Sequence, residues 1–359
     1  ARGGAAEEAS APGAACEGFA RRALEAGNIT PAVVTEALRL AKVPLQTRPN
    51  VVPDGTRAVH GMVLGMYVFV DRTGVSACSR RFPWLTRLLV RFGRQAHPDF
   101  PFTSVQVNVN YAARPHVDRN NLGQSQIIGL GAYTGGELWL HADDGDKTLP
   151  LEEDIGQERL YRKGTVWRGH DVDIRDKWFG FSGNKLHCTR PFRGTRYSLV
   201  YFTCDRYAEA SPETRAELRA AGFDFQWGSA ALKRLLQAKR RERQQLRELF
   251  EREARKGRRV GLLLVDDDQV CYQQENPKLP GCHAHKLYEG YRKARTIREA
   301  RRCGARNIDF QYDFNWGYLR VLGLHAVPAK WDVEIVDGRW SPQPAAAVAA
   351  VGVAGGAAR

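Results

Sequence analysis

The chain has 359 residues, of which 43% are hydrophobic and 10% aromatic, and a net charge of +14 at pH 7. This composition excludes wholesale disorder, and the length allows either one large domain with an appendage or two domains. The first 15 residues lack the apolar segment of a signal peptide, and the Ala/Val/Gly tail is too short and too weakly apolar to span a bilayer. We therefore expect no membrane partner.

The N-terminal part predicts helices with one strand between them. Thr30 followed by Pro31 is a typical helix start, with a capping hydroxyl before a proline at the first helical position. The expected elements are helices at residues 17–26 and 31–41, a strand at 63–70 that ends in a turn at 71–74, and a helix at 82–95 whose apolar stripe packs on a sheet.

From residue 103 the hydrophobic period changes to two. Val105, Val107 and Val109 alternate with Gln106, Asn108 and Asn110. Successive residues of a strand point to opposite faces, so one face of this strand is polar. Unpaired buried amides cost about 1–3 kcal/mol each, which indicates that the polar face lines a cavity.

Further short strands follow without intervening helices. They are expected at residues 126–130, 137–140, 164–167, 178–181 and 195–203. Many short strands joined by glycine-rich turns predict an antiparallel barrel or jelly roll, here in an α+β fold with flanking helices. The seven cysteines form no Cys-x-x-Cys pair, which is typical of neither a zinc ribbon nor a disulfide framework, so we expect a reducing intracellular compartment.

The C-terminal part is helical and carries the positive charge. Helices are expected at 212–222 and 229–256, a buried strand at 260–265, and three short helices with a turn at Gly304 in 288–319, as in a helix-turn-helix or any small helical bundle. Residues 229–259 hold twelve Lys/Arg against four Glu, and residues 286–306 hold eight against two, which accounts for the whole net charge. The concentration indicates a nucleic-acid partner and is compatible with a nuclear location, the alternative being solvated helix faces.

Three residues in the strand-rich region form a potential metal site. His116 and Asp118 are two positions apart, so they can reach one metal from a single strand end, and His187 can meet them across an antiparallel barrel. Two imidazoles and one carboxylate are the ligands of non-haem Fe(II) in its facial-triad form, which leaves coordination positions open. The sequence therefore predicts an oxidation.

Other histidines offer rival sets. His141 and Asp143 also have the His-x-Asp spacing, but they run into a turn, and His170 stands beside acidic residues on a predicted loop. Cys282 with His283 and His285 lacks partners at usable spacing, so we interpret it as part of a loop.

Four stretches of the strand-rich region resemble the Fe(II)/2-oxoglutarate-dependent dioxygenase superfamily. They are His-Val-Asp-Arg-Asn-Asn-Leu-Gly-Gln-Ser at 116–125, Gly-Ala-Tyr-Thr-Gly-Gly-Glu-Leu at 131–138, Phe-Ser-Gly-Asn-Lys-Leu-His at 181–187, and Pro-Phe-Arg-Gly-Thr-Arg-Tyr-Ser-Leu-Val-Tyr-Phe at 191–202. Within the superfamily, the sequence is similar to the TET/JBP-like branch, which oxidises the methyl group of thymine or 5-methylcytosine in nucleic acid.

The resemblance implies a double-stranded β-helix (jelly roll) and a set of site residues. Fe(II) would be held by His116, Asp118 and His187, and Arg196 with Ser198 would bind the 5-carboxylate of 2-oxoglutarate. Asn108, Asn110 and Asn121 would line the cavity and hold co-substrate or substrate. The implied reaction consumes O2 and 2-oxoglutarate and hydroxylates a C–H bond; ascorbate, used by one algal relative, stays open as the co-substrate.

The domain organisation expected from the sequence and the resemblance has five parts. They are disordered low-complexity ends at 1–15 and 341–359, a dioxygenase domain at 16–206 with its core at 104–203, a helical linker with the basic helix at 207–259, and a small basic helical module at 260–325. Two alternatives remain for the function, a hydroxylase of prolyl or lysyl side chains in protein and a catalytically dead module that binds nucleic acid.

Overall fold

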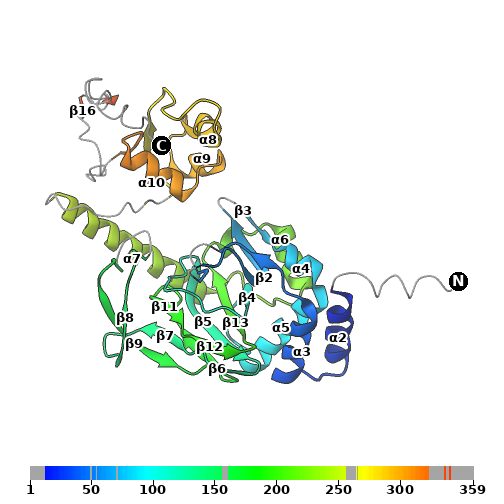
Figure 1. Cartoon of the computed structure of the whole chain (residues 1–359). Helices are drawn as coiled ribbons and strands as arrows, with labels where there is room; N and C mark the ends of the chain where they lie inside the picture. The colour runs from blue at the N-terminus through cyan, green and yellow to red at the C-terminus, as the bar shows by residue number, and fades with distance from the viewer. Residues whose placement is uncertain are drawn as a thin grey trace, which may run out of the picture. The chain divides into compact units, whose positions relative to one another are not determined.

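The computed structural model describes residues 13–48, 51–53, 55–69, 72–155, 161–255, 264, 266–322, 335–336 and 339–340. They form two compact units, Ala1–Arg241 and Glu242–Arg359 (Figure 1). In this part of the chain no helix is long and apolar enough to cross a membrane.

The first unit begins with four helices in its described part. They are α2 (Ala14–Glu25), α3 (Pro31–Ala41), α4 (Ala77–Arg81) and α5 (Pro83–Ala96). The Thr30 hydroxyl accepts a hydrogen bond from Val33 N at 3.3 Å, which confirms the predicted helix start. Because the first N–H groups of a helix have no partner inside it, Glu17 of α2 caps α5 by accepting from Trp84 N and Leu85 N at 2.8 and 3.1 Å.

A large antiparallel sheet lies against these helices. Its strand order is β1 (Leu45–Gln46), β2 (Val59–Phe69), β4 (Ser104–Val109), β13 (Tyr197–Cys204), β5 (Asn121–Leu130) and β10 (Phe179–Phe181), and β3 (Arg72–Val75) pairs with β2. The predicted turn at 71–74 is wrong from Arg72 onward. The ladder to β2 runs from Arg72 to Val75, so these residues are paired strand residues.

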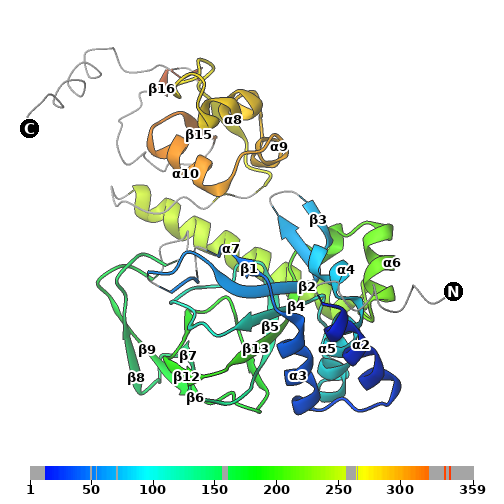
Figure 2. The ribbon, with the colours of Figure 1, turned by 45° about the vertical axis from the view of Figure 1, so that its right-hand side comes forward.

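A smaller antiparallel sheet forms the opposite side of the unit. It comprises β11 (His187–Thr189), β7 (Leu138–His141), β9 (Val166–Val172) and β8 (Lys147–Pro150), and a separate pair joins β6 (Tyr133–Gly135) to β12 (Phe192–Gly194). Figures 1 and 2 show the large sheet between the helices α2, α3 and α5 and the small sheet. The predicted class, mixed helix and antiparallel sheet, is confirmed.

The period of two in the central strands divides a core from a cavity. On β13, Leu199 and Tyr201 point into the hydrophobic core beneath the helices, whereas Ser198, Val200 and Phe202 line a cavity between the sheets. On β4, Val105 and Val107 lie in the same core, and Gln106 and Asn108 line the cavity, as the alternation predicts.

Gly93 of α5 packs closely against Tyr201 of the sheet. A Cβ atom at this position would lie 2.4 Å from Cε1 of Tyr201, whose hydroxyl is held by a hydrogen bond of 2.8 Å to Leu89 O. Gly93→Ala is therefore expected to lower the free energy of unfolding by about 1–2 kcal/mol, because overpacking outweighs the gain in helix propensity of about 1 kcal/mol. Urea unfolding measures this.

Gly18 of α2 provides the matched control. A Cβ atom there would meet only the mobile end of Arg22, at 3.4 Å. Gly18→Ala should raise the free energy of unfolding by up to about 1 kcal/mol. Equal effects of the two substitutions would contradict the packing described for Gly93.

The first unit ends with three helical elements. They are the short 3₁₀ helix η2 (Tyr207–Glu209), α6 (Pro212–Ala220) and the first part of α7 (Ala230–Arg255). Ser211 caps α6 by accepting from Thr214 N at 3.2 Å. Leu232 of α7 lies in the core of this unit.

The second unit is a small fold of helices and short strands. Strand β14 (Val270–Tyr272) pairs with β15 (Leu319–Val321), β16 (Ile335–Val336) pairs with β17 (Arg339–Trp340), and the helices are α8 (His283–Tyr291), α9 (Ile297–Arg302) and α10 (Asn307–Asn315). Gly304 has a φ of 97° and forms the predicted turn. The predicted strand at 260–265 lies outside the described residues except for Leu264, which is not in a strand.

Candidate metal centre and co-substrate pocket

His116 and His187 are held side by side by their own backbones. Each N–H donates to the other's carbonyl at 3.0 Å, in an isolated antiparallel bridge, and the two ring centroids lie 4.1 Å apart. The sequence indicated a strand end for His116 and Asp118. Instead, both residues lie in a loop after Pro115, and His116 pairs with His187 of β11 through this isolated bridge.

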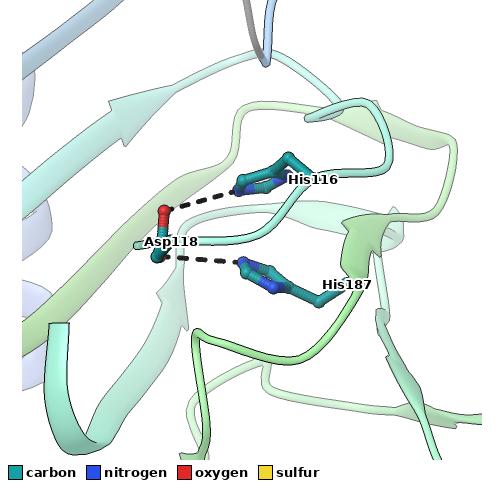
Figure 3. A group of neighbouring side chains, drawn as sticks. All are labelled: His116, Asp118 and His187. Atoms are coloured by element: carbon teal, nitrogen blue, oxygen red, sulfur yellow. Dashed lines mark ion pairs between the residues drawn. The ribbon is translucent and has the colours of Figure 1, made fainter. Parts of the chain in front are cut away.

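Asp118 completes the group from the same loop. Its backbone N donates to Gly183 O at 2.6 Å, and its carboxylate faces both imidazoles. Oδ1 lies 3.9 Å from His116 Nε2 and Oδ2 lies 3.8 Å from His187 Nε2, as Figure 3 shows. The three ligand atoms lie within 4.8 Å of one another, close enough to share one metal ion.

Both imidazoles present the nitrogen that a metal needs. Nδ1 of His116 lies 2.7 Å from Arg114 O, and Nδ1 of His187 lies 2.8 Å from Lys185 O. A carbonyl only accepts hydrogen bonds, so each Nδ1 carries the proton and each Nε2 keeps its lone pair. Burial, with the neighbouring His187, lowers the pKa of His116 to about 3, so this imidazole is neutral at pH 7. The donor set of two nitrogens and one carboxylate fits Fe(II).

The group opens into a cavity of about 90 Å³. At roughly 10–15 Å³ per water, this space corresponds to several waters, the size of a small organic acid. Asn108 and Ser198 face each other across β4 and β13, and Asn108 Nδ2 donates to Ser198 Oγ at 3.1 Å. Apolar side chains such as Phe181 and Val200 line the other walls.

The other two asparagines predicted to line the cavity, Asn121 and Asn110, differ in their positions relative to it. Asn121 lines the cavity and lies behind the metal group, since its Nδ2 donates to Asp118 Oδ2 at 3.3 Å. Asn110 is not among the residues that line the cavity. Its φ of 53° turns it off the pleat of β4, and its Oδ1 accepts from Arg196 N at 2.8 Å. Asn110 therefore holds the start of β13.

Arg196 is a buried cation that forms no ion pair with a described carboxylate. Its side chain lies between the rings of Tyr133 and Phe192, at 5.4 and 5.6 Å from their centroids, and is 3% exposed. Nη2 donates to Gly136 O at 3.2 Å, whereas Nε has no hydrogen-bond partner, and no carboxylate of the described residues pairs with it. Burial lowers the pKa of this guanidinium. Glu137 favours the charged form without forming an ion pair, and a buried guanidinium without an ion pair is costly, which favours an anionic ligand beside it.

No protein-family model matches the sequence, and no curated protein matches it. Among solved structures, a 2OG-Fe(II) oxygenase family oxidoreductase from Burkholderia pseudomallei is 19% identical over 52% of this chain and 89% of that chain, with a TM-score of 0.31. NgTET1 in complex with 5mC DNA is 14% identical over 40% of this chain and 60% of that chain, with a TM-score of 0.24. A Pseudomonas putida prolyl-4-hydroxylase is 14% identical over 53% and 84%, with a TM-score of 0.21.

These identities and TM-scores are low, so the function proposed below rests on the side chains of the site. The rival histidines do not form a second metal group within the described part of the chain. His141 contacts Tyr161 and the exposed Asp143, and His170 lies at the surface beside two aspartates. Cys282 is the N-cap of α8, and its Sγ accepts from His285 N at 3.3 Å.

Lys239 of α7 is a site residue that the sequence did not indicate. Its Nζ donates to Arg119 O, Asn121 O and Asp205 Oδ2 at 2.5, 2.8 and 2.9 Å. The lysine therefore holds the backbone that directly follows Asp118. In the sequence it is one of many cations on a basic helix, and nothing local distinguishes it from its exposed neighbours.

Lys239→Met is expected to weaken divalent-metal binding about tenfold, because residues that orient metal ligands typically contribute 10–100-fold to affinity. Mn(II) binding measured by equilibrium dialysis tests this. Lys233→Met, at an exposed position of the same helix, is the control and should leave the affinity unchanged. Equal affinities of the two variants would show that the loop keeps its place without Lys239.

Proposed function

We propose that this protein is an Fe(II)- and 2-oxoglutarate-dependent oxygenase that hydroxylates a C–H bond. The observation that carries the proposal is the group of His116, Asp118 and His187 on a cavity that Ser198 also lines, with the buried guanidinium of Arg196 two residues before Ser198 and in no ion pair with a described carboxylate. A protein that used this pocket only for structure would leave a buried positive charge unsatisfied.

Each residue of the site has a role in this function. When bound, the iron supplies the O2 chemistry that couples decarboxylation of 2-oxoglutarate to hydroxylation. His116, Asp118 and His187 hold the metal, and Arg196 with Ser198 binds the 5-carboxylate through charge-assisted hydrogen bonds. The apolar side chains of the lining, such as Phe181 and Val200, would limit the access of water to the reacting groups.

The fold we propose for the first unit is a double-stranded β-helix. Two antiparallel sheets supply the walls of the cavity, with Ser198 from the large sheet and His187 from the small one. The proposed unit of function remains a dioxygenase domain at 16–206, followed by a helical linker at 207–259 and a basic module at 260–325.

The substrate we propose is nucleic acid, and the C–H bond is most simply the methyl group of 5-methylcytosine or thymine, as in the TET/JBP-like branch. Support comes from the charge of the second unit. Several of its arginines pair internally, such as Arg298 with Asp267 at 3.0 Å. Four exposed cations pair with no carboxylate of the described residues, and these are Lys286, Lys293, Arg295 and Arg302. They provide phosphate contacts, and a nuclear location follows from this partner.

The test is incubation with Fe(II), 2-oxoglutarate and duplex DNA that contains 5-methylcytosine or thymine. Mass spectrometry of the digested nucleosides should find a base with one added oxygen, together with an equal amount of succinate. Succinate without a modified base would move the substrate to RNA or to prolyl or lysyl side chains. Absence of any oxidised product, with either 2-oxoglutarate or ascorbate, would contradict the proposal and favour a binding module.

A further inference from the structure

Arg48 brings a second guanidinium to the metal cavity. It comes from the segment between β1 and β2, is half-buried and is one of the residues that line the cavity. Its Nη1 lies 3.3 Å from Asn108 Oδ1 and 3.2 Å from Tyr111 OH. Both partners are neutral, and no carboxylate of the described residues pairs with Arg48.

These two contacts leave most of the guanidinium unused. Tyr111 OH already donates to Asn108 Oδ1 at 2.6 Å, so the longer contact from Arg48 is the weaker bond to the same oxygen. A guanidinium has five N–H donors in a planar fork, and only Nη1 is engaged here. Arg48 is therefore available to bind an anion with two parallel hydrogen bonds.

In the proposed function, 2-oxoglutarate does not satisfy both arginines. Its two carboxylates are assigned to the metal and to Arg196, which leaves Arg48 on the cavity wall without an anion among the described residues. The primary substrate is the remaining ligand that can carry one.

A second hollow lies beside the segment that carries Arg48. It has a volume of about 480 Å³ and is lined by Thr47, Val52, Thr56, Arg57 and Arg114, among others. The same segment walls both hollows, since Arg48 and Val51 face the metal cavity and their neighbours Thr47 and Val52 face the second one. Val51 O accepts from Arg114 N at 3.2 Å, which joins the segment to the chain just before His116.

The chemistry of this second hollow suits successive phosphates. Among the described residues, its polar side chains are cations and hydroxyls, and none of the described residues that line it is a carboxylate. Arg114 pairs with Glu153 at 3.2 Å, and Arg57 is exposed. Arginine and threonine side chains are common phosphate partners in nucleic-acid complexes. The metal cavity has about the size of the co-substrate, and the hollow beside Arg48 offers further space for a nucleotide.

We propose that Arg48 binds a backbone phosphate of a nucleic-acid substrate next to the base that is hydroxylated, with the strand running across the hollow lined by Arg57 and Arg114. This inference rests on the function proposed above. It makes Arg48 a substrate-specificity residue, distinct from Arg196, which binds the co-substrate.

The experiment uses the full chain loaded with Mn(II), without oxygen, so that binding is measured apart from turnover. The probes are 2-oxoglutarate, by calorimetry, and a fluorescent single-stranded oligonucleotide with one 5-methylcytosine, by anisotropy. A second oligonucleotide carries neutral methylphosphonate linkages on both sides of that base. The variants are Arg48→Gln, Arg48→Lys and the control Arg72→Gln, an exposed residue on β3, at the other end of β2.

Arg48→Gln should leave 2-oxoglutarate affinity unchanged, weaken binding of the phosphodiester strand about tenfold, and reduce the slope of log affinity against log salt by about 0.7. Arg48→Lys should keep the slope and recover part of the affinity. The methylphosphonate strand should bind wild type and Arg48→Gln equally, and Arg72→Gln should behave as wild type.

Two results would overturn the inference. Weaker 2-oxoglutarate binding by Arg48→Gln would assign Arg48 to the co-substrate. Equal loss on both oligonucleotides, or no loss, would show that Arg48 contacts no phosphate beside the base. If the wild-type protein binds no 2-oxoglutarate, the proposed function fails as well. If it binds 2-oxoglutarate normally, only the inference about Arg48 fails.

Discussion

Asp118→Ala is expected to lower divalent-metal affinity by about 100-fold or more and to abolish 2-oxoglutarate turnover. Asp118 is the one carboxylate of the group, and it faces both histidines at 3.8–3.9 Å. Without it, two neutral imidazoles must hold a divalent ion with no negative charge, and even residues that merely orient ligands contribute 10–100-fold. Mn(II) binding by equilibrium dialysis and succinate release measure the two effects.

The matched control is Asp143→Ala. Asp143 belongs to the other His-x-Asp pair, lies 3.4 Å from His141 Nε2 and is fully exposed. This variant should bind metal and turn over as wild type does. If Asp143→Ala lost metal binding and Asp118→Ala kept it, the metal centre would lie at the rival pair.

Arg196→Met is expected to raise the dissociation constant for 2-oxoglutarate about 100-fold and to leave metal affinity unchanged. The substitution removes a charge-assisted pair of hydrogen bonds, each contributing about 1.5–3 kcal/mol. Arg196 has no carboxylate partner in the described residues, so methionine also relieves a buried charge. Without co-substrate, the free energy of unfolding of the variant should therefore be equal to or higher than that of wild type.

Arg193→Met is the control for this substitution, because Arg193 is exposed on β12 only three positions away. It should bind 2-oxoglutarate normally. A marked loss of stability in Arg196→Met without any loss of co-substrate binding would mean that the arginine serves the fold alone.

The sequence predicts the candidate metal ligands because the chemistry of such ligands is restrictive. Few residue types bind Fe(II), and the polar face of β4 is visible as a period of two, so His116, Asp118, His187 and Asn108 could be named before the fold was known. Asn110 was expected to line the cavity but does not, because its own left-handed conformation interrupts the alternation at the end of β4. The sequence does not show that change of conformation.

Residues that depend on long-range packing could not be predicted. Lys239 reaches the loop after Asp118 from more than a hundred positions away, and it resembles every other lysine of a basic helix. Arg48 enters the cavity from a segment without a regular hydrophobic pattern. The turn expected at 71–74 was misplaced because glycine and threonine also occupy an edge strand when a partner ladder is present.

The most direct test of the proposed function is calorimetric titration of 2-oxoglutarate into the wild-type protein, with and without Mn(II), in the absence of oxygen. We predict one co-substrate bound per chain when the metal is present, and a large loss of affinity when it is removed, because in the proposed site the metal and Arg196 each hold one carboxylate of the co-substrate. Absence of binding, or an affinity that does not depend on the metal, would contradict a site in which His116, Asp118, His187 and Arg196 act together.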